Sequence, residues 1–188
     1  MNRTLSLFPV PGEDPPEPPK HTPAEPFTVG AIVESMRPKP GRADALHAIQ
    51  ALTGFIGRSQ LAAVASGMRG EERQFFYDKM VELADRVAGM PQTCEQQSLG
   101  EQASVSLHYF GGGQANWWIT EKDKGDPDDQ KNGVPPQSQA FGLADLFADG
   151  GELGYISIPE ILSCGGELDF HFTPRTLAQV RKEQRSRN

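Results

Sequence analysis

LHYFGGGQANWWITEKDKGD, residues 107–126, has the pattern of a β-hairpin. Before the turn, the apolar residues Val105, Leu107 and Tyr109 alternate with polar ones, which is the period of a strand with one apolar face. The three glycines of Gly111–Gly113 predict a turn, because glycine adopts positive φ freely. The segment therefore predicts two antiparallel strands joined by a glycine-rich turn.

The return strand, predicted at Asn116–Thr120, contains both tryptophans of the chain. Successive side chains of a strand point to opposite faces, so Trp117 and Trp118 should lie on opposite sides of the sheet. We expect one tryptophan in the core and the other covering the sheet or facing a partner. Stacking of nucleic-acid bases on an exposed tryptophan is a weaker alternative, because such platforms normally lie in basic grooves and this region is acidic.

Upstream of the hairpin, the apolar period changes to that of helices. Apolar residues at spacings of three and four in GRADALHAIQALTGFIGRSQ predict a helix that begins near Arg42. A second helix is predicted at Gln60–Ser66 with Ser59 as its N-cap, and a third at Glu71–Ala88. Residues 1–40 hold ten of the sixteen prolines, which predicts a disordered or polyproline-like arm.

Downstream of the hairpin, the predicted strands are Ala140–Phe147, Glu152–Ser157 and Leu168–Phe172. A short helix, opened by Pro159 at the first helical position and with Ser157 as a possible cap, is predicted between the last two strands. It should end near Cys164, and a C-terminal helix should begin at Pro174 with Thr173 as its cap and run into the basic tail.

Helices followed by an antiparallel sheet indicate the α+β class. We predict a helical N-terminal module followed by a sheet of about four or five strands with a short inserted helix. The expected divisions are an arm at 1–40, a helical module at 41–90, an α+β domain at 91–180 and a basic tail at 181–188.

The charge of the chain is unevenly placed. The net charge is -7, but residues 101–172 hold 12 acidic residues and 3 lysines, which gives -9. Residues 173–188 hold 5 basic residues and 1 acidic residue, which gives +4. A direct nucleic-acid interface driven by bulk charge is therefore not expected.

The chain shows no sign of a membrane or secreted protein. No apolar run reaches the length of about 18 residues that a membrane span needs, and the first residues lack the apolar stretch of a secretory signal. Two cysteines, Cys94 and Cys164, do not make a disulfide framework. We expect a cytoplasmic protein with reduced thiols.

Known reactive motifs are missing from the sequence. GGGQAN lacks the lysine and the following helix of a phosphate loop, and no nucleophile elbow or zinc signature occurs. A weak metal hypothesis is that His108, His171, Asp169 and Cys164 converge if the first and last strands of the sheet pair. Ordinary solvated side chains are the better interpretation of these four residues, and no cofactor is predicted.

Carboxylates near the turns form a second weak constellation. Glu121, Asp123, Glu152 and Asp145 could supply acid and base groups, although carboxylates at turns are usually only solvated. The long polar loop at Lys122–Gln137 is mobile or functional. The candidate binding surface at the hairpin and this loop is Trp117, Trp118, Glu121, Asp123, Asp126, Asp128 and Asp129.

Several blocks of the sequence, in order, resemble a known family. LHYFGGGQANWWITEKD, QAFGLADLF, ELGYISIPEIL and CGGELDFHFTPRTL are similar to the uncharacterised bacterial family called domain of unknown function 2958, over roughly Met90 to Leu177. Relatives tend to have a shorter turn that ends in cysteine where this chain has Gln114 and Ala115, which argues against a cysteine-based site at this turn. The family has no established activity, so the resemblance assigns no catalytic residue.

The resemblance implies a setting on plasmids, conjugative elements and phages. We therefore expect an accessory binding protein of a mobile genetic element, a candidate inhibitor of host restriction or CRISPR machinery. Its expected partner is a host protein, such as a nucleic-acid enzyme or a defence complex, because an acidic surface can compete for a basic groove. The alternative is an enzyme or DNA-processing accessory with its site at the hairpin and acidic loop.

Overall fold

The computed structural model describes residues 38–126, 128, 131–133 and 137–187. The predicted proline-rich arm lies outside the described residues except for its last three positions, 38–40. The helices, in chain order, are α2 (Arg42–Ala51), α3 (Arg58–Gly67), α4 (Arg73–Ala88), η1 (Gln97–Gln102), η2 (Gly112–Gln114), α6 (Ile158–Ser163) and α7 (Leu177–Arg187). The strands are β1 (Ser104–Val105), β2 (Leu107–Phe110), β3 (Asn116–Glu121), β4 (Ala140–Asp145), β5 (Glu152–Ile156), β6 (Glu167–Leu168) and β7 (Arg175–Thr176). No described helix is long and apolar enough to cross a membrane.

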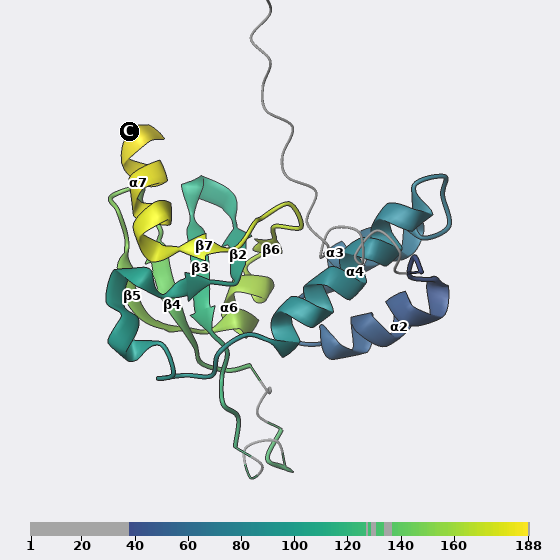
Figure 1. Cartoon of the computed structure of the whole chain (residues 1–188), viewed down its shortest axis with the longest axis horizontal. Coiled ribbons are helices and arrows are strands. Elements are labelled where there is room, and N and C mark those ends of the chain that lie inside the picture. Colours follow the sequence, from purple (N-terminus) through teal and green to yellow (C-terminus); the bar gives the residue numbers. More distant parts are fainter. Residues whose placement is uncertain (1–37, 127, 129–130, 134–136, 188) are drawn as a thin grey trace, which may run out of the picture. The chain divides into compact units, whose positions relative to one another are not determined.

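The strands form an antiparallel sheet of five, in the order β5-β4-β3-β2-β6, and a separate pair, β1-β7 (Figure 1). The predicted hairpin is β2-β3, in which Tyr109 faces Trp117 and His108 faces Trp118. The turn between them contains Gly113 at φ 69° and Gln114 at φ 74°. The predicted α+β class is confirmed, and α6 is the inserted helix.

The sheet has a hydrophobic cluster on each face. The first cluster joins one face to the helices and includes Leu52, Met80, Leu83, Leu107, Tyr109, Ile119, Ile156 and Ile158. The second cluster lies on the other face and consists of Ala103, Val105, Trp118, Leu143, Phe172, Leu177 and Val180. Both faces therefore carry packed apolar residues, whereas many antiparallel sheets leave one face to solvent.

The helical module and the sheet share the first cluster, so residues 39–188 form one compact unit rather than two domains divided at residue 90. The Tyr109 hydroxyl donates to the Phe55 carbonyl at 2.7 Å, and burial raises the pKa of this phenol. Lys122 Nζ donates to the carbonyls of Val87 at 2.8 Å and Ala88 at 3.1 Å, where the α4 dipole favours a cation. These bonds fasten the sheet to the helices.

The starts of two N-terminal helices differ from the prediction. α3 begins at Arg58, because the Gly57 carbonyl accepts the Leu61 N–H at 2.9 Å, and Ser59 is not its cap. α4 begins at Arg73 with Glu72 as its N-cap residue, two positions after the predicted start. The Ser157 cap of α6 is confirmed, since its side chain accepts the Glu160 N–H.

The predicted strand from Ser104 to Tyr109 is broken at Ser106. The Ser106 N–H donates to the Ile119 carbonyl at 2.9 Å. Before Ser106, β1 pairs with β7, and after it, β2 pairs with β3. Val105 therefore enters the second cluster and Leu107 the first, although a regular strand would place both on one face.

The predicted strand Leu168–Phe172 is also shorter. The Asp169 carboxylate accepts the His171 N–H at 2.9 Å, and this turn ends β6 at Leu168. The C-terminal helix begins later than predicted, at Leu177. Thr176 Oγ1 accepts the Gln179 N–H at 3.3 Å, and Gln179 Oε1 accepts the Thr176 N–H at 2.9 Å, which is a capping box. Residues 181–187 of the predicted basic tail thus belong to α7, and Asn188 lies outside the described residues.

Candidate functional site

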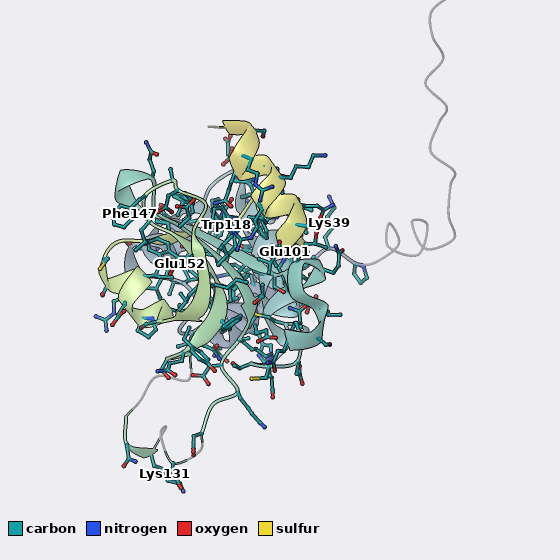
Figure 2. All side chains as sticks on the ribbon, turned by 90° about the vertical axis from the view of Figure 1, so that its left-hand side faces the viewer. Lys39, Glu101, Trp118, Lys131, Phe147 and Glu152 are labelled. Atoms are coloured by element: carbon teal, nitrogen blue, oxygen red, sulfur yellow. The ribbon has the colours of Figure 1, made fainter. Side chains whose placement is uncertain are left out.

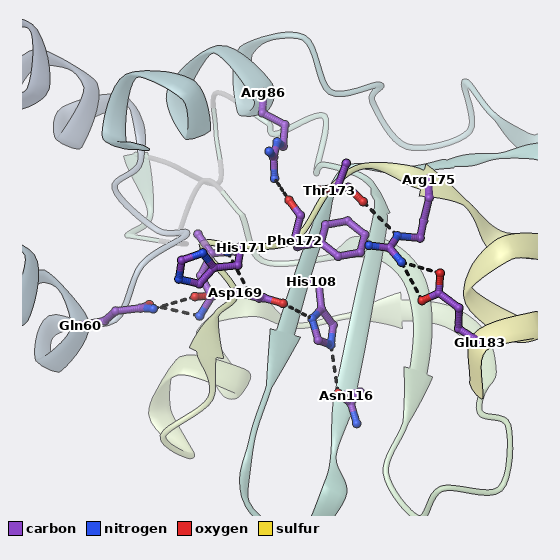
Figure 3. Close-up of polar contacts among 11 residues, drawn as sticks. Gln60, Arg86, His108, Asn116, Asp169, His171, Phe172, Thr173, Arg175 and Glu183 are labelled. Carbon is purple, nitrogen blue, oxygen red and sulfur yellow. Dashed lines mark hydrogen bonds and ion pairs between the residues drawn. The ribbon is translucent and has the colours of Figure 1, made fainter. Parts of the chain in front are cut away.

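His108, on β2, is held on both sides of its ring. Its Nδ1 lies 3.0 Å from Asp169 Oδ2, and its Nε2 lies 3.0 Å from Asn116 Oδ1 (Figure 3). The Asn116 amide nitrogen donates to the Gln114 carbonyl at 2.7 Å, which turns its oxygen toward the imidazole. The ring stacks on Trp118 at a centroid distance of 5.1 Å. His108 therefore joins β2, β3 and the turn after β6, and neither ring nitrogen faces an open cleft.

Of the four proposed metal ligands, only His108 and Asp169 have side chains in contact. The pairing of β2 with β6 brings them together, as the metal hypothesis required. The His171 ring instead stacks on Phe75 at 5.8 Å, and Cys164 is exposed after α6. Among the residues that the structure describes, no three His, Cys, Asp or Glu side chains group closely enough to hold a metal ion.

The Asp169 carboxyl has a pKa lowered by its surroundings. Partial burial opposes its ionisation, but hydrogen bonds from His108 and the His171 N–H outweigh burial and hold the pKa below its ordinary 3.8. A carboxyl with a lowered folded-state pKa stabilises the fold above its unfolded pKa, and this contribution is lost as pH falls through the folded pKa. We therefore expect Asp169→Asn to destabilise the protein at pH 7 and to lose this effect in acid.

The measurement is urea denaturation of both proteins between pH 7 and about pH 2.5. The difference in free energy of unfolding should be constant down to about pH 5 and then shrink below it. Asp126→Asn, which changes an exposed carboxylate, is the control and should show no such trend. A difference that stays constant into acid would show that the carboxylate charge at Asp169 does not stabilise the fold.

Glu121, predicted as an acid/base or binding residue, has a structural role. Its side chain is buried at the end of β3, and its two oxygens accept the N–H groups of Cys94 at 2.8 Å and Gln96 at 2.6 Å. Cys94 has a φ of 77°, a conformation that a residue with a side chain rarely adopts. Glu121 therefore holds the strained segment before η1 against the sheet.

Asp123 closes the base of the acidic loop. Its carboxylate accepts the Gly125 N–H at 2.8 Å, the Ser138 hydroxyl at 3.0 Å and the Gln139 N–H at 3.0 Å. Partial burial opposes ionisation of Asp123, but these hydrogen bonds outweigh it and lower the pKa below its ordinary value. The carboxylate is thus engaged in joining the two ends of the loop.

The other predicted carboxylates do not form an acid/base pair. Asp145 is buried and accepts the Gln184 amide at 2.7 Å, while Glu152 is exposed at the start of β5. On the loop, Asp126 and Asp128 are exposed, and Asp128 pairs with Lys131 at 2.7 Å. Asp129 lies outside the described residues.

The two tryptophans lie on opposite faces, as predicted, but neither forms an exposed platform. Trp118 is 8% exposed in the second cluster, where α7 and the β1-β7 pair cover the sheet. Trp117 is partly buried against the first cluster. The expected binding surface at the hairpin is therefore wrong for Trp118 and for Glu121, because both are buried.

Four exposed apolar side chains lie instead on the β4-β5 hairpin, and the other large ones among the described residues, Leu46, Phe75, Leu99 and Phe110, are spread over other elements. Phe147, which Figure 2 labels, is 81% exposed. Tyr155 is 65% exposed, and Leu146 and Leu153 are also exposed. The sequence prediction missed this surface because it extended β4 through Phe147. The structure ends β4 at Asp145, so the two residues before Ala148 lie in the turn. The residues Asp149, Gly150 and Gly151 favour a turn, but the apolar residues before them give no local sign that β4 ends at Asp145.

The turn between β4 and β5 is held in place by hydrogen bonds. Asp145 Oδ1 accepts the Asp149 N–H at 3.2 Å, and Asp149 Oδ1 accepts the Gly151 N–H at 3.2 Å. Arg181 Nη1, from α7, donates to the Gly150 carbonyl at 3.0 Å. Phe147 is therefore an exposed aromatic side chain on a well-supported turn. We name Leu146 and Phe147 the hairpin tip.

A groove of about 270 Å³ lies beside β5 on the face of the second cluster. Phe141, Leu177 and Ala103 are apolar residues that line it, and Leu153 and Tyr155 of β5 line its edge. Phe141 and Tyr155 are in edge-to-face contact at 5.6 Å. The groove is apolar in character and opens next to the exposed residues of β5.

Comparison of the chain with models of protein families, with curated proteins and with solved structures found no match. The candidate surface therefore rests on the geometry of this chain. That geometry points to the hairpin tip and to β5 rather than to the carboxylates of the β2-β3 hairpin.

Proposed function

We propose that this chain is a binding protein of a mobile genetic element. It binds a protein of the host's restriction or CRISPR machinery and thereby blocks the surface that this protein uses. The observation that carries the proposal is Phe147, an aromatic residue that is 81% exposed on a turn pinned by hydrogen bonds. The setting comes from the resemblance to domain of unknown function 2958.

An aromatic side chain on a rigid turn suits a binding anchor. A few buried aromatic residues supply most of the binding energy in protein interfaces. Because Asp145, Asp149 and Arg181 already order the turn, little conformational entropy is lost when Phe147 enters a pocket of a partner. The adjacent Leu146 extends the apolar surface.

The charge of the sheet region favours a partner with a basic surface. Residues 101–172 carry 12 acidic residues against 3 lysines, and Asp149 and Glu152 lie on the same hairpin as Phe147. Opposite charges accelerate association and orient the two proteins. A nucleic-acid enzyme exposes such a basic surface, so occupying it would block access of the nucleic acid.

The alternative of an enzyme with its site at the β2-β3 hairpin has less support. Both oxygens of Glu121 accept backbone N–H groups, and Asp123 accepts three hydrogen bonds that close the loop. Carboxylates committed in this way are poorly suited to accept a proton from a substrate. A binding role is thus the function that the geometry favours.

The test is protection of incoming phage or plasmid DNA in cells that express the chain together with a restriction or CRISPR system. We expect the wild type to protect and Phe147→Ala to reduce the affinity for the target by about 30-fold, the effect of losing a hot-spot residue worth about 2 kcal/mol. The affinity is measured with the purified defence proteins by calorimetry.

Leu46→Ala is the matched control, because Leu46 is an exposed apolar residue on α2, far along the chain from the hairpin tip. This control should bind and protect like the wild type. Equal affinity of Phe147→Ala and wild type would refute the role of the hairpin tip. A wild type that protects against neither restriction nor CRISPR interference would refute the proposed target class.

A further inference from the structure

The two edges of the five-stranded sheet differ in how their backbone groups are satisfied. At the β6 edge, the Gln60 side chain of α3 donates to the Leu168 carbonyl at 2.7 Å and accepts the Leu168 N–H at 3.1 Å. This amide takes the place of a neighbouring strand. At the other edge, β5 pairs with β4 on one side only, and within the described residues no hydrogen bond joins its outer side to another segment.

Strand β5 also lacks several of the features that prevent edge strands from pairing, and its one charged side chain is Glu152 at its start. Its sequence, ELGYI, contains no lysine and no proline, and its register with β4 runs from Glu152 to Ile156 without a bulge. Proteins normally protect an exposed edge by such features. Instead, Leu153 and Tyr155 leave 42% and 65% of their surfaces exposed (Figure 2 labels Glu152, which begins this strand).

We infer that β5 pairs with β5 of a second copy of this chain, antiparallel and about a two-fold axis at Gly154, so that two sheets of five strands become one. An isologous contact of this kind is the commonest way in which identical chains associate. The interface differs from the hairpin tip, so this inference goes beyond the proposed function.

The sequence of β5 is complementary to itself in this register. With Gly154 opposite Gly154 of the second copy, Leu153 lies opposite Tyr155 of the second copy, and Tyr155 opposite its Leu153. These pairs share a face of the sheet, and pairs of aromatic and aliphatic side chains across strands are favourable. They would add apolar side chains of the second copy beside the groove that Leu153 and Tyr155 line.

Charge does not oppose this register. Glu152 is the charged residue of β5, and it lies opposite Ile156 of the second copy rather than opposite Glu152. The glycine at the axis removes any clash between side chains where the two strands are symmetric. In the second copy the residue opposite Glu152 is apolar, so the pairing avoids the destabilising contact of two like charges directly opposite each other.

The first test is the mass of the full chain in solution by analytical ultracentrifugation. We expect twice the 20.5 kDa of one chain. Tyr155→Lys should weaken the dimer by at least about 10-fold, because it places an ammonium group on the edge and against leucine. Leu46→Lys, an equivalent change on α2, should leave the dimer intact. A monomer at all concentrations, or a dimer that Tyr155→Lys does not weaken, would overturn the inference.

A second test checks the register by cysteine crosslinking in a Cys94→Ser, Cys164→Ser background, since both native thiols are free and exposed. Gly154→Cys should form a disulfide-linked dimer, and a Cβ at Gly154 meets no atom within 4 Å. Glu152→Cys should not, because two copies of residue 152 would lie about 13 Å apart along the strands, too far for a disulfide.

Crosslinking at residue 152 but not at residue 154 would overturn the two-fold register. Failure of Gly154→Cys to crosslink, in a protein with a native circular dichroism spectrum, would overturn it as well. The Phe147→Ala result does not depend on either outcome, because Phe147 lies in the turn before β5.

Discussion

Trp118→Ala should lower the free energy of unfolding by about 3–5 kcal/mol, the usual cost of replacing a buried tryptophan with alanine. Trp118 is 8% exposed, belongs to the second cluster and stacks on the His108 ring. Its removal leaves a cavity between the sheet and α7, and it also removes one wall of the contact that orients His108. The surrounding cluster cannot fill this space fully, because it is built from both the sheet and α7.

The measurement is urea denaturation followed by far-UV circular dichroism, since the substitution removes a fluorophore. Phe110→Ala is the matched control. Phe110 is on the same hairpin, is 42% exposed, and should cost less than about 1.5 kcal/mol. Similar losses for Trp118→Ala and Phe110→Ala would mean that the second cluster does not depend on the tryptophan.

Glu121→Ala is the second substitution with a large expected effect. It leaves the N–H groups of Cys94 and Gln96 without their acceptors, and the second of these bonds is buried. The buried Gln96 donor alone costs about 1–3 kcal/mol when left unsatisfied, and the partly buried Cys94 donor adds less because water reaches it, so the total loss should be about 2–4 kcal/mol. Glu121→Gln keeps one acceptor oxygen and should lose about half as much.

Thermal and urea unfolding measure this effect, and Glu167→Ala, an exposed carboxylate on β6, is the control. The order of stability should be wild type, Glu121→Gln, then Glu121→Ala. If Glu121→Ala unfolds at the same urea concentration as the control, the carboxylate does not hold the segment before η1. Glu121 would then again be a candidate for chemistry.

Local pattern predicted the elements whose partners are close in sequence. The β2-β3 hairpin follows from alternation on both sides of a glycine turn, and the end of α4 at Gly89 follows from its apolar stripe and stop signal. In each case a short segment carries enough information to specify the contact.

The errors arose where distant segments compete for the chain. Val105 and Leu107 have the spacing of one strand face, but β7 pairs with the first and β3 with the second. Phe170 and Phe172 have the same spacing, and the turn at Asp169 sends them to different clusters. Periodicity cannot reveal such breaks, because it records the spacing of apolar residues and not the identity of the surface that covers them.

The amino-acid sequence by itself determined the α+β class, the hairpin and the opposite faces of the two tryptophans, because these depend on the period of side chains along a strand. Only the tertiary structure decided which polar groups are available. Glu121 accepts the N–H of Cys94 and Asp123 accepts the N–H of Gln139, and both donors are distant in sequence from the carboxylate that they contact. Phe147 is exposed because β4 ends before it, and the outer side of β5 is exposed because β5 is the last strand of the sheet. Availability depends on what packs against a residue, and that is a property of the whole fold.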